Sequence, residues 1–576
     1  MKSTILMILL AASLLTAGDA QVFQAMNLEL SRAMKDLRIE TMEKPYFISL
    51  RFTDAGEMSA GAAFGKITSE RLDPKENHYR FVQAVVRVGA PELDNTNFKG
   101  GSFRSDYSDM SAIPLTDDVE VLREEFWLAI DGAYKRSLST FAEKKGYLEK
   151  HPQEDYPPDF LPAPAAGNFT GHEPPMMTSA GMADFVKGLS AGLRRYPFLS
   201  EGTADLSVIR LNQYYLDSEG NRHIRPSALM TLSVGMKAYT KEWYPLSRSL
   251  TWIVSDPGAL PPQADILKAV EVDALYLQAL QTVKPLEEYT GPVLFEGEAA
   301  GGFFLNLLGK GLSNPREVLA SEQAGYFMEM LSGKEGFLGK RFGSRILPEG
   351  FRVVDRPVQE SFQGKALAGF MPVDDEGMKS GEVVLVEKGR LIGLPMTRAA
   401  VKKFKEVNGH AVGGLFQAPK ASVTNLFIED ARGLDARAFK EKIKALAKEQ
   451  GKEEILVVRA FEGASQDITA MVLRMGGGGT PSLLDPPARA YLVNVATGEE
   501  RPVWGMEFRD VTPDILQKIA ASGADAGLYQ FSQALRNLGG RPVSIIAPDI
   551  LVEEMSLQKA KLEKLRPPLT PMPELK

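Results

Sequence analysis

The sequence changes character at residues 289–302, which run YTGPVLFEGEAAGG. Short apolar segments typical of β-strands are frequent after this stretch, and we predict a domain boundary near residue 286. Glu298 is an acidic residue of the kind favoured at a helix N-terminus, where it complements the helix dipole. The 576-residue chain is also too long for one hydrophobic core. We therefore expect a mixed α/β domain over residues 21–286 and a larger β-rich domain over residues 287–558, together an α+β fold.

The second half predicts more strands than helices. Strands are expected at residues 383–386, 423–427, 455–461, 469–475 and 489–494. One clear helix is predicted at residues 435–450, because Asp435 can cap it and Phe439, Ile443 and Leu446 form an apolar stripe. A tail rich in Lys, Pro and Leu (residues 559–576) is expected to be loosely ordered after a short helix.

The first half predicts helices and strands in alternation. Helices are expected at residues 21–44, 180–194 and 263–285, and a long one after Thr116, Asp117 and Asp118, which supply a cap and acidic residues. Strands are expected at residues 46–52, 68–72, 81–88, 204–215 and 226–239, the last two joined by a hairpin turn at residues 217–221. Residues 151–178 are rich in Pro, Gly and Ala, and we expect them to form a surface connection or flap.

The first twenty residues predict export. Lys2 precedes an apolar run at residues 5–15, and Gly18 and Ala20 are small residues suited to a cleavage site. An uncleaved membrane anchor is disfavoured, because the run is shorter than the roughly 18–20 residues that span a bilayer. We expect cleavage after Ala20 and a periplasmic or secreted protein, with no membrane span elsewhere.

The amino-acid composition limits the ligands and the catalytic groups that this chain can have. The formal net charge is −7, so the chain has no general attraction to nucleic acid. It has no cysteine, which excludes disulfides, thiolate nucleophiles and metal sites with cysteine ligands. Five histidines are present. Metal binding through imidazole is therefore restricted to very few positions.

Several segments, in order, resemble the TldD/PmbA family, also described as modulators of DNA gyrase or U62-type peptidases. Residues 289–295 resemble the family's Y-x-G-P-V-L strand, which leads directly into a catalytic helix. The other resembling segments are residues 216–220 (N-S-E-G turn), 373–377 (D-D-E-G turn), 386–393 (E-x-G-x-L-x-G hairpin), 408–411 (G-x-A) and 423–426 (x-T-N-L). Closest in character is the PmbA (TldE) type, a non-catalytic subunit.

The resemblance implies a metal site that this chain has lost. TldD-type members have an H-E-x-x-x-H helix and a distant cysteine that hold the metal, while the glutamate acts on the metal-bound water. Both histidine positions are glycine here, so no metal or other cofactor is expected. The resemblance implies a degenerate catalytic position at Glu298 and a binding cleft that includes Gly297, Gly301, Gly302, Asp374, Asp375, Glu376 and His410.

Other chemical signals are weak. His172 and Glu173 begin like a metalloprotease motif, but the prolines that follow break the helix the motif needs. The carboxylates of residues 374–376 could bind Ca²⁺ or Mg²⁺, although turn and cap roles are favoured. Residues 476–479 are all glycine without a P-loop lysine, which favours a flexible loop. A lone histidine in a glycine-rich loop, as at His410, is expected to be an incidental surface residue.

Three functions remain open at this stage. The first is an exported, non-catalytic subunit that pairs with a TldD-type subunit, or with itself, and helps to enclose a peptide substrate. The second is a stand-alone peptide-binding protein of the cell envelope, which would bind extended peptides by strand addition. The third is a metallopeptidase with a non-standard site. The family is peptidase-related, but the sequence leaves enzymatic activity undecided.

Overall fold

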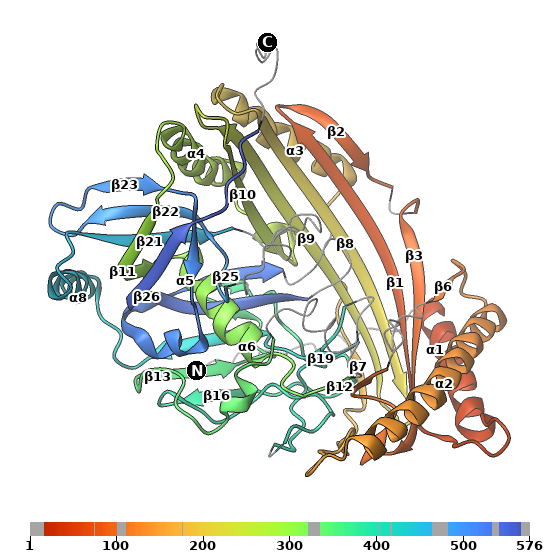
Figure 1. The fold of residues 1–576 in the computed structure, drawn as a ribbon. Helices are drawn as coiled ribbons and strands as arrows, with labels where there is room; N and C mark the ends of the chain where they lie inside the picture. The colour runs from red at the N-terminus through yellow and green to blue at the C-terminus, as the bar shows by residue number, and fades with distance from the viewer. Residues whose placement is uncertain are drawn as a thin grey trace, which may run out of the picture.

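The computed structural model describes residues 17–73, 75–100, 111–175, 177–320, 335–402, 404–414, 418–462, 482–532 and 541–565. Two large sheets dominate it (Figure 1), one built from the first half of the chain and one from the second. The predicted α+β fold class is confirmed. The strand expected at residues 469–475 and the glycines at 476–479 lie outside the described residues.

The first sheet consists of long antiparallel strands in the order β10-β9-β8-β1-β3-β4. Their bounds are β1 Pro45–Ala63, β3 His78–Ala90, β4 Leu93–Asp94, β8 Glu201–Asp217, β9 Arg222–Tyr239 and β10 Pro245–Val254, with β2 Lys66–Arg71, β6 Ser111–Ile113 and β7 Asn168–Thr170 alongside. The predicted hairpin turn after β8 is present, because Asp217 accepts hydrogen bonds from the backbone of Glu219 and Asn221.

Four helices cover one face of this sheet. They are α1 Ala17–Asp36, α2 Val119–Lys150, α3 Ser179–Gly192 and α4 Gln263–Leu280. α1 and α2 lie at one end of the sheet, and α3 and α4 at the other (Figure 1). Alternation along β1 packs Leu50 and Phe52 with the first pair of helices and Met58 with the second pair. Among the described residues, no helix is both long and apolar enough to cross a membrane.

Two helices end earlier than the sequence predicts. The first stops at Asp36 instead of residue 44, because Glu40 has a φ of 42° and Pro45 disfavours a helical residue before it. The fourth stops at Leu280 instead of residue 285. A cap within residues 116–118 was predicted for α2, and the residue that supplies it is Asp118, which accepts hydrogen bonds from the backbone N–H groups of Glu120 and Val121.

The second sheet is mixed, in the order β17-β16-β13-β20-β26-β11-β21-β22-β23, and β24 and β25 also pair with β26. Its strands are β11 Glu288–Phe295, β13 Phe351–Asp355, β16 Val383–Glu387, β17 Arg390–Leu391, β20 Asn425–Asp430, β21 Glu454–Phe461, β22 Pro487–Asn494, β23 Glu500–Val503, β24 Met506–Arg509, β25 Ile519–Ser532 and β26 Pro542–Lys559. β26 is the structural centre, because four strands pair with it. No short helix precedes the described part of the tail: β26 runs to Lys559, where that helix was expected.

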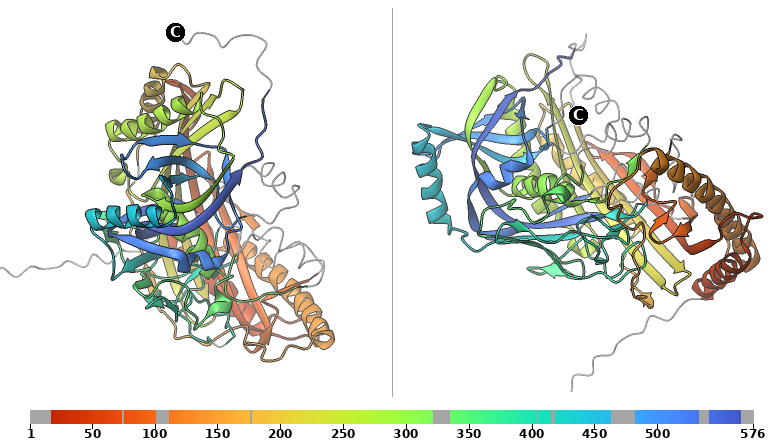
Figure 2. Two further views of the ribbon diagram at one scale, coloured as in Figure 1. Left: turned by 60° about the vertical axis from the view of Figure 1, so that its left-hand side comes forward. Right: turned by 60° about the horizontal axis from the view of Figure 1, so that its bottom comes forward.

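Helices pack on both faces of the second sheet (Figure 2). On one face, α5 Glu298–Phe304 continues through a π-helical turn at Leu305–Gly309 into α6 Lys310–Leu312, and its apolar residues lie in the main core. On the other face, α8 Ala436–Glu449 packs Leu446 against Leu294 and Leu551. Asp435 caps α8 as predicted, by accepting from the backbone of Ala438. Short two-stranded pairs complete the fold: β5 Phe98–Lys99 with β12 Leu319–Ala320, β14 Ser361–Phe362 with β15 Lys365–Ala366, and β18 Ala411–Val412 with β19 Lys420–Ala421.

The prediction of a surface flap at residues 151–178 is wrong for the central part of this segment. Asp159, Phe160 and Leu161 are buried. The backbone N–H of Phe160 donates to Pro91 O, and that of Leu161 donates to Arg398 O. The segment therefore crosses between the two halves of the molecule and is fixed to both. Composition alone predicted exposure, whereas three consecutive residues are anchored by tertiary contacts.

A buried ionic network holds this crossing in place. Lys144 on α2 donates to Asp159 and also to the carbonyl oxygens of Asp94 and Thr96 at 2.9 and 2.6 Å. Arg316, from the second half, donates to Asp159 Oδ1 at 3.1 Å. Desolvation lowers the pKa of Lys144 despite the neighbouring carboxylate. The network thus links α2, the crossing segment and the second domain.

Replacing Lys144 with Met tests this role. The variant leaves buried oxygen acceptors unsatisfied, so we expect the free energy of unfolding to fall by about 3–5 kcal/mol. Lys145→Met is the matched control, because Lys145 is exposed and lies 3.4 Å from the half-exposed Glu43; its change should stay within about 0.5 kcal/mol. Urea unfolding measures both variants, and equal stability of the two would contradict the role assigned to Lys144.

Candidate functional site

The chain turns sharply between β11 and α5. Gly297 has φ 59° and ψ −127°, a backbone conformation that residues with a Cβ rarely adopt. Its N–H donates to Asp549 Oδ1 at 2.8 Å, which fixes the turn against β26. Glu298 is the first residue of α5, in agreement with the expected position of an acidic residue at a helix N-terminus.

Aromatic side chains pack directly on the next two glycines of α5. A Cβ on Gly301 would lie 2.6 Å from Tyr529 Cδ2, and a Cβ on Gly302 would lie 2.6 Å from Phe461 Cδ2. Real Cβ atoms do not approach other atoms so closely, so both positions require glycine unless the rings move. The space beside α5 is therefore filled by Tyr529 and Phe461.

Glu298 has crowded surroundings, here called the recess, that include Arg248, Arg489 and Asp273. Its side chain is exposed, yet the surrounding protein desolvates the carboxylate and raises its pKa, against the opposing effect of Arg248 and Arg489. Burial also raises the pKa of Asp549, and that of Tyr529 to about 12. The recess can therefore hold a proton on a carboxylate more readily than an open surface could.

One wall of the recess is an ionic bridge between the two halves of the chain. Asp273 on α4 is fully buried and accepts from Arg248 Nε of β10 at 3.0 Å. It also accepts from Arg489 Nη1 of β22 at 2.6 Å. Both arginines are thus held by Asp273, and neither has a hydrogen bond to Glu298.

The family's metal does not fit this segment. A histidine at position 297 would be strained by the positive φ, and one at position 302 would collide with Phe461. The chain has no cysteine to supply a thiolate. Over the part of the chain that the structure describes, no three His, Cys, Asp or Glu side chains lie close enough to hold a metal ion. We derive no metal-dependent step from this site.

The acidic turn at residues 374–376 is a structural support. Asp374 accepts from the backbone N–H groups of Glu376, Met378 and Ala411 at 2.8–3.0 Å. Asp375 accepts from Gly413 N at 2.7 Å and from the side chain of Arg225. Burial opposes ionisation of Asp375, but Arg225 and Arg51 hold its pKa below the usual value.

The residues that were expected to form one binding cleft lie in two separate places. Asp375 and Glu376 line a cavity against the first sheet, and Asp374 and Asp375 line a smaller one beside it. Neither cavity is lined by Glu298 or by the glycines at positions 297, 301 and 302.

His410 is fully buried, so the expectation of an incidental surface histidine is wrong. Its Nδ1 lies 3.0 Å from Asn408 O, and because a carbonyl only accepts, Nδ1 is the protonated nitrogen. Its Nε2 lies 3.6 Å from Asp355 Oδ2. Burial lowers the pKa of His410 even though Asp355 opposes this. The residue packs inside the domain and lines neither cavity.

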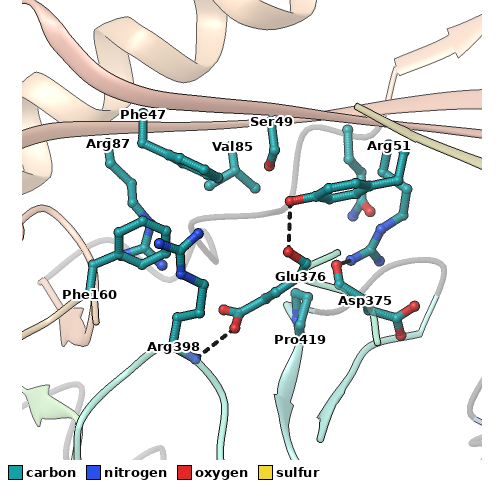
Figure 3. Close-up of a pocket in the computed structure, with 12 residues that line it drawn as sticks. Phe47, Ser49, Arg51, Val85, Arg87, Phe160, Asp375, Glu376, Arg398 and Pro419 are labelled. Atoms are coloured by element: carbon teal, nitrogen blue, oxygen red, sulfur yellow. Dashed lines mark hydrogen bonds between the residues drawn. The ribbon is translucent and has the colours of Figure 1, made fainter. Parts of the chain in front are cut away.

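The sequence analysis missed the larger cavity, which is small and opens to solvent. Figure 3 shows Phe47, Ser49 and Arg51 of β1 facing Glu376, Arg398 and Pro419 across it. Residues separated by more than 300 positions meet here, and no local pattern could have indicated that. Alternation of side chains along β1 could have shown only that Phe47, Ser49 and Arg51 share a face.

Comparisons with known proteins agree with this architecture. The model of the PmbA/TldA metallopeptidase C-terminal domain matches residues 288–559. No curated protein matches. A candidate modulator of DNA gyrase from Thermotoga maritima superposes with a TM-score of 0.57 at 16% identity, covering 93% of this chain and 99% of that one.

Two further solved structures share the fold. TldE from Thermococcus kodakarensis gives a TM-score of 0.54 at 13% identity, covering 92% of this chain and 99% of its own. A candidate DNA gyrase modulator from Bacteroides thetaiotaomicron gives 0.57 at 12% identity, covering 95% and 100%. The fold and the matched domain define a two-domain α+β protein related to metallopeptidases. Residues 288–559 form a domain of the TldD/PmbA family, and the whole chain shares the fold of the three solved structures.

Restoring the lost histidines tests whether the scaffold could still hold a metal. In the Gly297→His/Gly302→His variant, backbone strain and overpacking should each cost about 1–3 kcal/mol, and no zinc should bind. Gly146→Ala is the control, because Gly146 lies in α2 with open space around its Cα; it should be neutral or slightly stabilising. Thermal unfolding and elemental analysis are the measurements. Stoichiometric zinc in a stable double variant would contradict our conclusion.

His223 supports the same acidic turn and gives a pH-dependent test. It is buried, its Nε2–H donates to Gly377 O at 3.0 Å, and desolvation lowers its pKa from 6.5. Because the unfolded chain binds a proton at higher pH than the folded one, this contribution to stability is complete above 6.5 and is lost as pH falls toward the folded-state pKa.

His223→Gln should reduce that loss. Between about pH 7.5 and pH 5.5 we expect the wild type to lose up to about 1.4 kcal/mol more than the variant, measured by urea unfolding at both pH values. His151→Gln is the control, since His151 is exposed at the end of α2, and it should follow the wild type. Equal losses in the His223 variant and the wild type would refute the role given to His223.

Proposed function

We propose that this chain is an exported, non-catalytic member of the TldD/PmbA family, which serves as a partner subunit of a peptide-cleaving complex. The main support is the β11–α5 turn. Both positions at which the family's catalytic subunit has histidine are glycine, one held at positive φ and the other packed against Phe461. Peptide cleavage would then depend on a second subunit.

The packing favours this proposal over a recently damaged enzyme. A single lost ligand would leave the remaining ligands and an open space beside the helix. Here Tyr529 and Phe461 occupy the space beside Gly301 and Gly302, and Gly297 adopts a conformation suited to glycine. The retained Glu298 still faces solvent at the mouth of the recess, where it could contact a peptide or a partner.

Export is the second part of the proposal. Cleavage after Ala20 would leave Gln21, which is exposed, as the first residue. Val22, Phe23 and Met26 would remain to pack α1 against the sheet. The hydrogen bond from Tyr214 OH to Asp19 would be lost, but among the removed residues whose side chains the structure describes, 18–20, none belongs to the apolar core.

Co-purification tests the partner proposal. The full chain is expressed with a homologue from the same genome that has a complete H-E-x-x-x-H motif. We expect the two proteins to co-elute in size-exclusion chromatography, with zinc only on the homologue, and cleavage of unfolded peptides by the mixture. Mass spectrometry of the exported chain should give an N-terminus at Gln21.

Three outcomes would oppose the proposal. Reproducible failure to co-elute with any such homologue would contradict the partner role. A bound peptide without a TldD-type subunit would favour a stand-alone binding protein. Stoichiometric transition metal at residues 296–302 of this chain would favour an active metallopeptidase. The control is the homologue alone, which establishes how much activity requires the complex.

A further inference from the structure

The larger cavity contains two hydrogen-bond donors that lack protein acceptors. Arg51 and Gln83 are directly opposite each other in the register of β1 and β3, and both line the cavity. The buried atoms Arg51 Nη1 and Gln83 Nε2 have no hydrogen-bond acceptor among the described residues. Gln83 is only 7% exposed. Buried donors are nearly always paired, so these two point to an acceptor that comes from outside the chain.

Arg51 is also the arginine of the cavity without a carboxylate of its own. Its Nη2 donates to the backbone oxygen of Asp375 at 2.8 Å, and no ion pair of Arg51 occurs within the described ranges. The other two arginines each have a carboxylate partner: Arg87 pairs with Asp94, and Arg398 pairs with Glu219.

The acidic residues nearby neutralise Arg51 only in part, although Asp375 and Arg51 attract each other. Asp375 is held by the side chains of Arg225 and Arg541. Glu376 Oε2 accepts from the backbone N–H of Arg398 at 2.8 Å. The electrostatic potential beside Arg51 Nη1 therefore favours a ligand with one negative charge. A monoanion matches this balance better than a dianion, which would be placed close to Asp375 and Glu376.

The remaining wall of the cavity is apolar and rigid. Phe47, Val85 and Phe160 line it. The guanidinium of Arg398 lies 3.6 Å from the centre of the Phe160 ring, and that of Arg87 lies 4.0 Å from it. These stacked groups fix the ring (Figure 3), so the apolar surface beside the two donors is preformed.

We propose that this cavity binds a carboxylate that has an apolar substituent. The carboxylate oxygens accept from Arg51 Nη1 and Gln83 Nε2, and the substituent packs against Phe47 and Phe160. A carboxylate with an apolar substituent occurs both at the C-terminal residue of a peptide and in a small carboxylic acid. Binding at this cavity does not depend on a partner subunit or on a metal.

Calorimetric titration of the full chain tests the proposal. The ligands are 3-phenylpropionate, the peptide acetyl-alanyl-phenylalanine as its free acid, and the C-terminal amide of that peptide. At least one acid should saturate the protein, and the amide should bind at least about tenfold more weakly, because it lacks the charge that Arg51 recognises. The acid that binds more tightly identifies the source of the carboxylate.

Variants assign the binding to the cavity. Arg51→Gln should reduce affinity for the acid at least about tenfold, and Gln83→Leu should reduce it by a smaller factor while keeping the charge. Arg432→Gln is the control, because Arg432 is an exposed arginine paired with Glu349 elsewhere on the surface; it should bind like the wild type. Thermal unfolding confirms that each variant is folded.

The proposal is overturned if acid and amide bind equally, if neither acid binds at millimolar concentration, or if folded Arg51→Gln keeps full affinity. Tighter binding of inorganic phosphate than of either acid would also overturn it. The titration uses this chain alone. Its failure would leave the partner-subunit proposal standing, and failure to find a partner would leave the carboxylate site standing.

Discussion

The buried carboxylate of Asp159 is the contact on which the arrangement of the two halves depends. It accepts from Lys144 of α2, from Arg316 of the second half, and from the backbone N–H of Asp94 at 2.9 Å. An isolated buried charge would be costly, but two cations and several donors compensate for its lost hydration. Because Asp159 is fixed, its neighbour Phe160 is fixed beside β1, where it forms a wall of the larger cavity. The ionic network therefore positions the binding surface without belonging to it.

A second constraint acts at α5, where backbone and side chains together exclude the metal chemistry of the family's catalytic subunits. The absence of histidine alone would show only that the ligands are missing. The positive φ of Gly297 and the contact of Phe461 with Gly302 show in addition that a histidine would be strained at the first position and would collide with Phe461 at the second. The recess nevertheless keeps a carboxylate, Glu298, whose pKa is raised by desolvation. The segment can thus present a polar surface to a peptide or subunit without supplying a metal.

Local features were predicted well from the sequence, and features built by tertiary contacts were not. Asp118 and Asp435 cap their helices as expected, because capping depends on residues two or three positions away. The extent of β1 was underestimated, since its missed part, residues 53–63, is rich in Ala, Gly and charged residues instead of the β-branched and aromatic residues typical of strands. His410 was expected at the surface, yet the whole domain buries it. The larger cavity combines residues from both halves of the chain, so no window of sequence contains it.

The buried Nη1 group of Arg51, which has no acceptor among the described residues, is the feature that the fold explains least as a stabilising element. The long alkyl stem of Arg51 could pack against Tyr215 equally well if a methionine replaced it, and such a residue would leave no buried donor unsatisfied. Rigid neighbours hold this donor next to Gln83 although folding gains nothing from it. Buried polar groups that lower the stability of the fold are characteristic of functional sites such as binding sites. The glycines of α5 and the donors of this cavity lie in separate places, so the proposals drawn from them are independent of each other.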